Sequence, residues 1–320
     1  MPIGIDWGGT SIKAAIVDGA AVRGFARIET SGEPAAILDA IAGLVRVLDP
    51  RTESVGVAIP GEVRPDGRCW RLPNVPGFED VNIGAELHAR LNLPIGVEND
   101  ATAAALAERL YGWGNQYGSF LLVTLGTGIG GGLVLDGHVR RGTGGFAGEI
   151  GHVLVESGEQ AWTCGCGKRG CMEAYAGIAG LLRKYAAVKG SDSLFGTKRG
   201  SDPLSAASAT EEEGTKRGFD PFPRTIKEIA DADDAGTQAV WQQLGWALGT
   251  GLGVINNVLD LDAIVFTGGV ANSLSRFEAL IRKAMQARAF APPLAQLPLL
   301  TSRLGEQAGV IGAAHLPAAK

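Results

Sequence analysis

Three of the four cysteines lie within eight residues, at Cys164, Cys166 and Cys171. The spacing C-x-C-x4-C, with glycines that let the backbone fold around a small ion, predicts a tetrahedral metal site. A disulfide is disfavoured in a cytosolic chain, and three cysteines leave one unpaired. His152 is the only nearby imidazole and can complete a Cys3His set, which would be closed and therefore structural. We predict a structural Zn2+; the alternative is a group of free buried thiols.

Three carboxylates are placed where they could act on a polyol. Asp100 follows a predicted strand at 94–98 and precedes an Ala-rich helix, so it is either a helix cap or a general base at a strand end. A carboxylate at a helix N-terminus should have a lowered pKa and act by position. The predicted metal site would hold Glu149 and Glu173 near each other, and vicinal hydroxyls need such paired acceptors.

Residues 126–132 form a glycine-rich turn between two predicted strands, 119–125 and 132–135. The pattern G-x-G-x-x-G occurs in it, but the dinucleotide fingerprint requires a helix directly after the glycines. Because a second strand follows, we interpret the stretch as a strand–turn–strand clamp for phosphate, where backbone amides approach a ligand closely. A hairpin without a ligand is the alternative.

Residues 3–18 repeat this arrangement near the N-terminus, with the turn Gly8-Gly9-Thr10 between two short strands. Two such hairpins, about one domain-length apart, suggest two halves of a nucleotide cleft. Asp6 ends the first strand beside the turn and is a candidate Mg2+ ligand, since that ion takes one or two carboxylates and keeps several waters. Otherwise it is a turn carboxylate.

A third glycine pair, Gly268-Gly269, lies between a predicted strand at 261–266 and a predicted helix at 273–288. A strand that runs through glycines into a helix favours an anion contact at the helix N-terminus. We expect this segment on the adenosine side of the same cleft.

The composition fits a soluble globular protein, with 45% hydrophobic and 20% charged residues. Glycine makes up 48 of 320 residues, roughly twice its usual share. The net charge of −5 without a basic cluster argues against nucleic acid binding. The chain opens almost directly on a strand, so no signal peptide is expected. Residues 235–259 are uncharged, but their Gln and Asn side chains favour a buried helix over a membrane span.

Periodic apolar positions predict helices at 35–47, 83–91, 174–188, 225–232 and 302–315, and strands at 54–59 and 94–98. Within the long uncharged helix, Gly245, Gly249 and Gly253 at four-residue spacing would let another element pack closely. Residues 60–80 are rich in Pro, Gly and Asn and form a long loop, either functional or a surface excursion. Residues 189–224 break the pattern and are expected to be a loop insertion.

With these pieces assembled, the chain resembles the ROK family of repressors, open reading frames and sugar kinases, especially its bacterial glucokinases. The resemblance covers nearly the whole length apart from residues 189–224. It is carried by Asp6–Lys13, Asn99-Asp100-Ala101, the 126–132 turn, Glu149-Ile150-Gly151-His152 with the cysteine segment, and Gly268-Gly269. Trp7 departs from the family, which commonly has a smaller aliphatic residue there.

The resemblance implies an α/β, actin-like ATPase (ribonuclease H-like) fold of two domains with an interdomain cleft. The domains would be residues 1–115, completed by a C-terminal helix at about 302–320, and residues 116–301, with the zinc site and the insertion. It also implies ATP with Mg2+, phosphorylation of a hexose at its 6-hydroxyl, a cytoplasmic location and a homodimer. The repressors carry an N-terminal helix-turn-helix, which this sequence lacks.

By position, Asp100 would be the catalytic base. The residues around the sugar would be Gly61, Asn74, Asn99, Asp100, Glu149, His152 and Glu173. The residues around ATP and Mg2+ would be Asp6, Gly8, Gly9, Thr10, Lys13, Gly126, Thr127, Gly128, Gly268 and Gly269. Glucose is the expected substrate. N-acetylglucosamine, N-acetylmannosamine, fructose or allose kinases, a polyphosphate-using glucokinase and a sugar-sensing protein without turnover remain alternatives.

Overall fold

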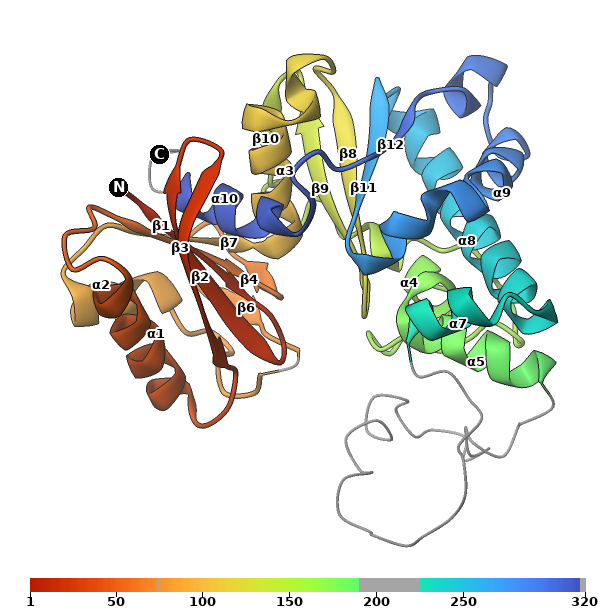
Figure 1. Cartoon of the computed structure of the whole chain (residues 1–320). Helices are drawn as coiled ribbons and strands as arrows, with labels where there is room; N and C mark the ends of the chain where they lie inside the picture. The colour runs from red at the N-terminus through yellow and green to blue at the C-terminus, as the bar shows by residue number, and fades with distance from the viewer. Residues whose placement is uncertain (74, 190–224, 317–320) are drawn as a thin grey trace, which may run out of the picture.

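The computed structural model describes residues 1–73, 75–189 and 225–316. Two five-stranded sheets dominate it, and they lie in separate halves (Figure 1). The first sheet has the order β3 (Ala21–Glu29), β2 (Ser11–Asp18), β1 (Ile3–Trp7), β4 (Val55–Ile59) and β7 (Ile95–Asn99). The second has the order β10 (His138–Arg140), β9 (Ile129–Leu135), β8 (Phe120–Leu125), β11 (Ala263–Thr267) and β12 (Leu299–Thr301).

The two sheets repeat one topology. In each, an antiparallel meander supplies three strands and two parallel strands extend the sheet from the first strand of that meander. The central parallel strands β4 and β11 are buried at every position, as expected for strands covered on both faces. The predicted hairpins at 3–18 and 119–135 are therefore the equivalent hairpins β1–β2 and β8–β9 of the two halves.

Helices α1 (Pro34–Leu48) and α2 (Ile83–Leu91) pack with the first sheet, whose core includes Ile37, Ile41 and Leu87. Between the two sheets lie α3 (Asp100–Tyr111) and the short C-terminal α10 (Ala308–Ala314) (Figure 1). Helix α10 contacts β1 and β4 so closely that a Cβ on Gly4 or Gly56 would overlap its backbone. This packing requires glycine at two strand positions.

In the second half, α8 (Ala235–Leu259) and α9 (Leu274–Gln286) form the largest helix pair. A Cβ on Gly245 or Gly249 would overlap Leu280 or Ile281 of α9, so the predicted close packing at these glycines is confirmed. The remaining helices there are α4 (Met172–Ala176), α5 (Ile178–Val188) and α7 (Ile226–Ala232). Within the described ranges, no helix combines the length and the hydropathy needed to cross a bilayer.

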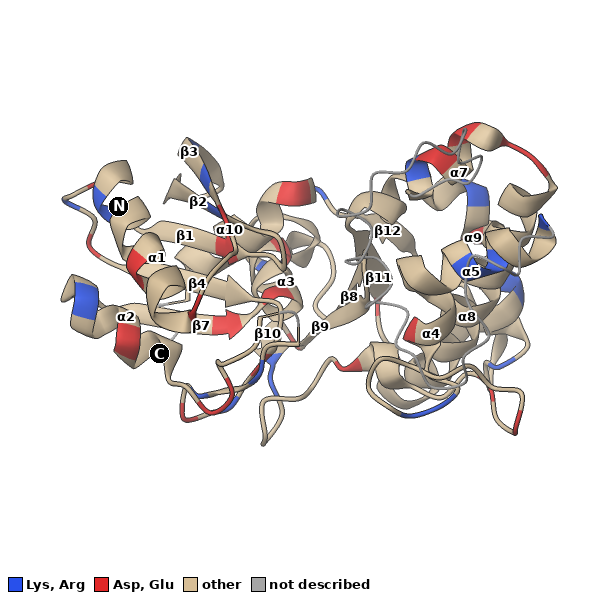
Figure 2. Ribbon diagram, turned by 90° about the horizontal axis from the view of Figure 1, so that it is seen from below, with Lys and Arg blue, Asp and Glu red and all other residues tan. Residues whose placement is uncertain are grey.

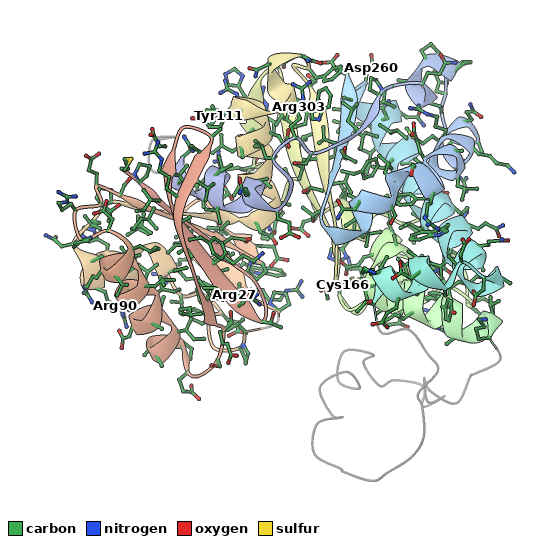
Figure 3. All side chains as sticks on the ribbon, viewed as in Figure 1. Arg27, Arg90, Tyr111, Cys166, Asp260 and Arg303 are labelled. Carbon is green, nitrogen blue, oxygen red and sulfur yellow. The ribbon has the colours of Figure 1, made fainter. Side chains whose placement is uncertain are left out.

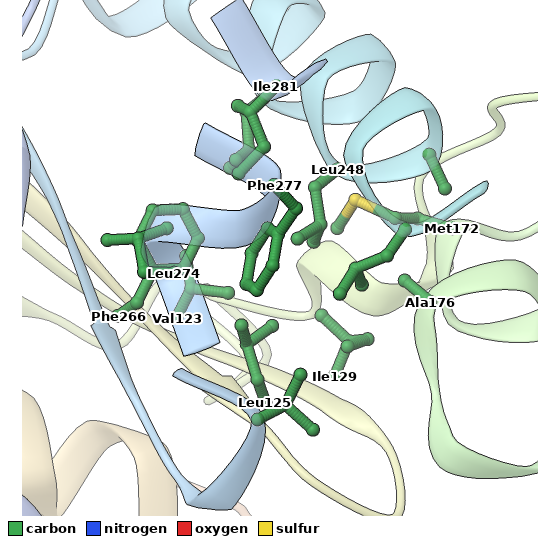
Figure 4. Close-up of a cluster of buried hydrophobic side chains, with 14 of the residues drawn as sticks. Val123, Leu125, Ile129, Met172, Ala176, Leu248, Phe266, Leu274, Phe277 and Ile281 are labelled. Carbon is green, nitrogen blue, oxygen red and sulfur yellow. The ribbon is translucent and has the colours of Figure 1, made fainter. Parts of the chain in front are cut away.

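The core of the second half anchors the β8–β9 hairpin. Val123, Leu125 and Ile129 point into a cluster that includes Phe277 of α9 and Leu248 of α8 (Figure 4). Because the hairpin buries its apolar face there, its glycine turn is fixed at the edge of a packed core.

Two predicted helices differ from the structure. The helix expected at 174–188 is interrupted at Gly177, whose backbone is extended. Ile178 N donates to Gly126 O at 3.3 Å, and α5 begins at Ile178. The helix expected at 302–315 is α-helical only from Ala308. Before it, Ser302 Oγ and Leu304 N donate hydrogen bonds to the buried Glu108 carboxylate, and Gly305–Gln307 forms a 3-10 turn. A small two-stranded sheet, β5 (Glu62–Val63) and β6 (Cys69–Arg71), was not predicted. The predictions for Asn74 and for residues 190–224 lie outside the described residues.

Candidate active site

The turn between β8 and β9 is held by side chains as well as by its own backbone. Gly126 N donates to Gly128 O at 3.1 Å, and Gly130 N donates to Thr124 Oγ1 at 3.0 Å. Ile129 N donates to Glu173 Oε2 at 2.9 Å. Strand β9 follows the turn directly, so the strand–turn–strand interpretation is confirmed and the dinucleotide fingerprint does not apply.

The turn between β1 and β2 is held by backbone contacts and by one residue just after β3. Gly8 N donates to Ser11 O at 2.8 Å, and Thr30 Oγ1 donates to Gly8 O at 2.9 Å. Asp6 is paired across the hairpin with Lys13. Burial raises the pKa of the Asp6 carboxyl, the charge of Lys13 lowers it, and Glu306 raises it again. A buried carboxylate with one cation beside it can accept a further cation.

Asp100 is the first residue of α3, and Asn99 is the N-cap, with its Oδ1 accepting from Thr102 N at 3.0 Å. Asp100 Oδ1 accepts from Ala101 N at 2.7 Å. Burial, with a smaller contribution from the charges of Asp6 and Glu149, raises the pKa of Asp100 to about 7. The expected lowered pKa was wrong, because desolvation of the carboxyl group outweighs its hydrogen bonds with the backbone. The N-cap of the helix is therefore Asn99 and not Asp100.

The loop after β4 lies against Asn99, whose Nδ2 donates to Gly61 O at 3.2 Å. The next residue, Glu62, was not predicted from the sequence as a site residue. It is 7% exposed, and its Oε1 accepts a hydrogen bond from Arg71 Nη2 at 3.3 Å. In the described part of the chain, Glu62 Oε2 has no hydrogen-bond partner. A carboxylate directly after the glycine that ends an apolar strand was the available signal for it. Glu62 is also the charge that most raises the pKa of Glu149.

Glu149 lies among the carboxylates that were predicted to contact a sugar. Burial, together with the charges of Glu62 and Glu173, raises its pKa to about 7 against the lowering effect of Arg71. Its Oε2 is 3.8 Å from His152 Nε2. The cluster therefore concentrates negative charge with one arginine to offset it, an environment that favours hydrogen-bond donors such as the hydroxyls of a sugar.

A second unpredicted pair crosses between the halves. Arg141, which follows β10, donates to the buried Glu98 at the end of β7. Phe146 on the same segment packs edge-to-face on Trp70 of β6, with ring centroids 5.3 Å apart. The segment from Arg141 to Glu149 thus contacts the first half at two points.

The predicted metal ligands converge. The ligand atoms of His152, Cys164, Cys166 and Cys171 all lie within 4.8 Å of one another. Cys164 Sγ is 3.7 Å from His152 Nδ1, and Cys166 Sγ is 3.7 Å from Cys171 Sγ. All three cysteines are free thiols, and Figure 3 shows Cys166 on the segment that precedes α4. One imidazole and three thiols are a donor set that fits tetrahedral Zn2+ and leaves no open position.

The third glycine segment lies beside the β8–β9 turn. Gly268 has φ +90°, and a Cβ there would overlap Leu125 O at the end of β8. Gly268 also lines a small pocket at the carboxyl ends of β11 and β12, together with Phe266, Thr267, Ala271, Asn272, Thr301, Ser302, Gly305 and Glu306. The charge of Glu306, which lines this pocket, raises the pKa of Asp6 in the first hairpin, so the two carboxylates lie within electrostatic range of each other.

Comparison with known proteins identifies the family. A profile of the ROK family matches residues 2–320. The chain belongs to the ROK family. The glucokinase of Halalkalibacterium halodurans is 31% identical, over 98% of this chain and 94% of that protein. The N-acetyl-D-glucosamine kinase of Pasteurella multocida is 30% identical, over 99% of both chains.

Among solved structures, a ROK family glucokinase from Streptomyces griseus in complex with glucose and AMPPNP matches with a TM-score of 0.78 and 29% identity. The match covers 100% of this chain and 99% of that one. The predicted actin-like ATPase fold is therefore confirmed for this ROK protein, and its two sheets of equal topology are the repeated halves of that fold.

Proposed function

We propose that this ROK protein is an ATP-dependent hexose kinase that transfers the γ-phosphate of ATP to the 6-hydroxyl of glucose. The observation that supports it best is the position of Asp100. Its carboxyl group is buried at the start of α3 and is coupled electrostatically to Asp6 of the first glycine hairpin and to Glu149 of the sugar-side cluster. A base between a phosphate turn and a set of hydroxyl acceptors is the arrangement that a sugar kinase requires.

In the proposed reaction, the sugar O6 attacks the γ-phosphorus, the bond to the β,γ-bridging oxygen breaks, and ADP leaves. Asp100 accepts the O6 proton. With a pKa near 7, the carboxyl group is a stronger base than an ordinary aspartate and is still largely ionised at slightly alkaline pH. Because the transition state of phosphoryl transfer is loose, the proton can leave late.

The nucleotide would lie between the two turns. The turn residues Gly8, Gly9, Thr10, Gly126, Thr127 and Gly128 would lie around the phosphates and contact them through groups other than Gly8 N and Gly126 N, which donate within their own turns. The pocket beside Gly268 and Gly269 would take the adenosine. Lys13 would offset phosphate charge. Asp6 would hold Mg2+, which, when bound, offsets the charge of the transferring phosphate.

The sugar would be held by Gly61, Asn74, Asn99, Glu149, His152 and Glu173, with Asp100 at its 6-hydroxyl. Structural Zn2+ on His152 and the three cysteines would fix Glu149 and Glu173 from opposite ends of one segment. The N-acetylglucosamine kinase among the relatives supports a second candidate, a kinase for N-acetylhexosamines.

An assay of ADP release with purified protein tests the proposal. Glucose, fructose, mannose, N-acetylglucosamine and N-acetylmannosamine are compared at equal concentration with ATP and Mg2+, and polyphosphate replaces ATP in a parallel series. Glucose is expected to give the highest kcat/KM. Sugar binding by calorimetry without ADP release from any member would instead indicate a sugar-sensing protein.

We extend the proposal to the domains and the assembly. Residues 1–115 with the C-terminal helix would move as one unit against residues 116–301, and the protein would be a cytoplasmic homodimer without nucleic acid or membrane partners. Acidic and basic residues are interspersed over both halves (Figure 2), which supports the absence of a nucleic acid surface. Light scattering coupled to size exclusion measures the oligomer.

A further inference from the structure

The carboxylate of Glu173 lies between the cysteine cluster and the β8–β9 turn. Its Oε2 accepts a hydrogen bond from Ile129 N at 2.9 Å, and its Oε1 lies 3.5 Å from Cys164 Sγ. Oε2 therefore has a backbone partner, which the expected role of this residue, a contact for a sugar hydroxyl, does not account for.

The backbone around Glu173 reinforces the link to the turn. Gly177 N donates to Glu173 O at 2.8 Å, which ends α4. Ile178 N then donates to Gly126 O at 3.3 Å. The segment from α4 to the start of α5 thus contacts both sides of the turn, through the Glu173 side chain at Ile129 and through the Ile178 backbone at Gly126.

The fit at the turn leaves little freedom. A Cβ on Gly128 would overlap Glu173 Oε2, and a Cβ on Gly177 would lie 3.0 Å from Thr127 O. The turn therefore packs closely against the Glu173 carboxylate at the start of α4 and against Gly177 at its end. Without Glu173, the Ile129 amide would lose a charged acceptor in a half-buried turn, and such a loss disfavours the ordered conformation.

We propose that Glu173 is a positioning residue for nucleotide binding, which holds the β8–β9 turn in the conformation whose amides meet the phosphates. It links that turn to the cysteine cluster, so the metal segment supports the nucleotide side of the site as well as the sugar side. The inference rests on the proposed function, because it assumes that this turn binds ATP.

Binding of AMPPNP and Mg2+ in the absence of any sugar tests it, by calorimetry on the purified full chain. Glu173→Ala should weaken AMPPNP about 10-fold, because a backbone amide loses a charged acceptor. Glu173→Gln keeps an oxygen acceptor of the same length and should stay within about 3-fold of the unchanged protein. Glu159→Ala is the matched control, since Glu159 is an exposed carboxylate of the same segment whose side chain has no partner in the described ranges.

Hydrogen exchange at the Ile129 amide gives a second readout that a sugar contact would not move. Exchange should be faster in Glu173→Ala than in Glu173→Gln. If the alanine variant does not fold, Glu173→Asp, whose shorter side chain keeps the charge, takes its place with the same expected ordering. If AMPPNP affinity and hydrogen exchange at Ile129 are both unchanged in Glu173→Ala, this inference is wrong while the proposed function still stands. No AMPPNP binding by the unchanged protein would instead reject the proposed function.

Discussion

The two glycine turns have similar sequences but are held in different ways. The β1–β2 turn depends on contacts close by: Gly8 N donates to Ser11 O, and Thr30 Oγ1, just after the adjacent strand β3, donates to Gly8 O. The β8–β9 turn also depends on a distant segment, through Glu173 at Ile129 and Ile178 at Gly126. Local residues fix the first turn, whereas the second is fixed by the segment that follows the cysteines.

This difference explains why a closed metal site would matter in a kinase. A short segment rich in glycine has little apolar surface of its own to bury, so it needs another constraint to hold a carboxylate still. Metal binding to His152 and the cysteines would supply that constraint for the second half, while the first half needs none. Changes at the two turns should therefore have separable effects.

The largest expected effect is at Asp100, which belongs to neither turn. Asp100→Asn should lower kcat at least ~10²-fold, because the base is lost. Sugar and AMPPNP affinities should change little, since Asn keeps the oxygen that accepts from Ala101 N. Steady-state kinetics and calorimetry measure both quantities. Near-normal turnover in this variant would remove Asp100 from its assigned role.

The pH dependence sharpens the same assignment. A base with a pKa of about 7 loses activity as pH falls below that value, so kcat/KM for the sugar should rise with pH and level off above about 7.5. The folded-state pKa is higher than the ordinary value of 3.8, so ionisation of Asp100 destabilises the native state as pH rises from about 4 to 7. Asp100→Asn should therefore raise Tm at pH 8 and leave it nearly unchanged at pH 4.5.

Both hairpins, their glycine turns and the metal ligands could be predicted from the sequence, because strand composition, glycine and cysteine spacing are local signals. The pKa of Asp100 could not, since its shift comes from burial between segments far apart in the chain. Arg141 was missed for the same reason, since its partner Glu98 belongs to the other half. Glu62 and Arg71 pair across the small β5–β6 sheet of the first half, which lies in the stretch that was expected to be a loop. Gly177 shows the converse: a helix predicted from local periodicity is broken by a tertiary contact to Gly126.

The next largest effect separates packing from ligand contact within the second hairpin. A Cβ on Gly132 would overlap Ala101 O and Ala105 of α3, whereas a Cβ on Gly126 would meet no atom within 4 Å. Gly132→Ala should therefore lower the free energy of unfolding by roughly 2–3 kcal/mol, as measured by urea denaturation. Gly126→Ala, the control, should keep its stability within about 0.5 kcal/mol but weaken AMPPNP. Equal stability losses in the two variants would contradict this division of the turn.

Loss of the metal site should disturb one turn and spare the other. Cys166→Ser is expected to reduce the bound zinc from about one per chain to near zero and to lower Tm by several degrees. Elemental analysis and differential scanning calorimetry measure these changes. Hydrogen exchange should accelerate at Ile129 and stay constant at Gly8. An unchanged protein without bound zinc would refute the metal assignment, and equal acceleration at both amides would refute the separation of the turns.

The smallest effect concerns the support beneath the first turn. Trp7 is fully buried and packs edge-to-face on Phe78, with ring centroids 5.1 Å apart, while its Nε1 has no hydrogen-bond partner in the described part of the chain. Trp7→Phe removes this unpaired donor, which is favourable, and leaves a small cavity, which is unfavourable. The two terms oppose each other, so the unfolding free energy should change by less than about 1 kcal/mol, against roughly 3–5 kcal/mol for Trp7→Ala. AMPPNP affinity should be unchanged in Trp7→Phe, since Ser11 and Thr30 still hold the turn. A large loss of affinity would mean that the first turn also depends on support from outside its own residues.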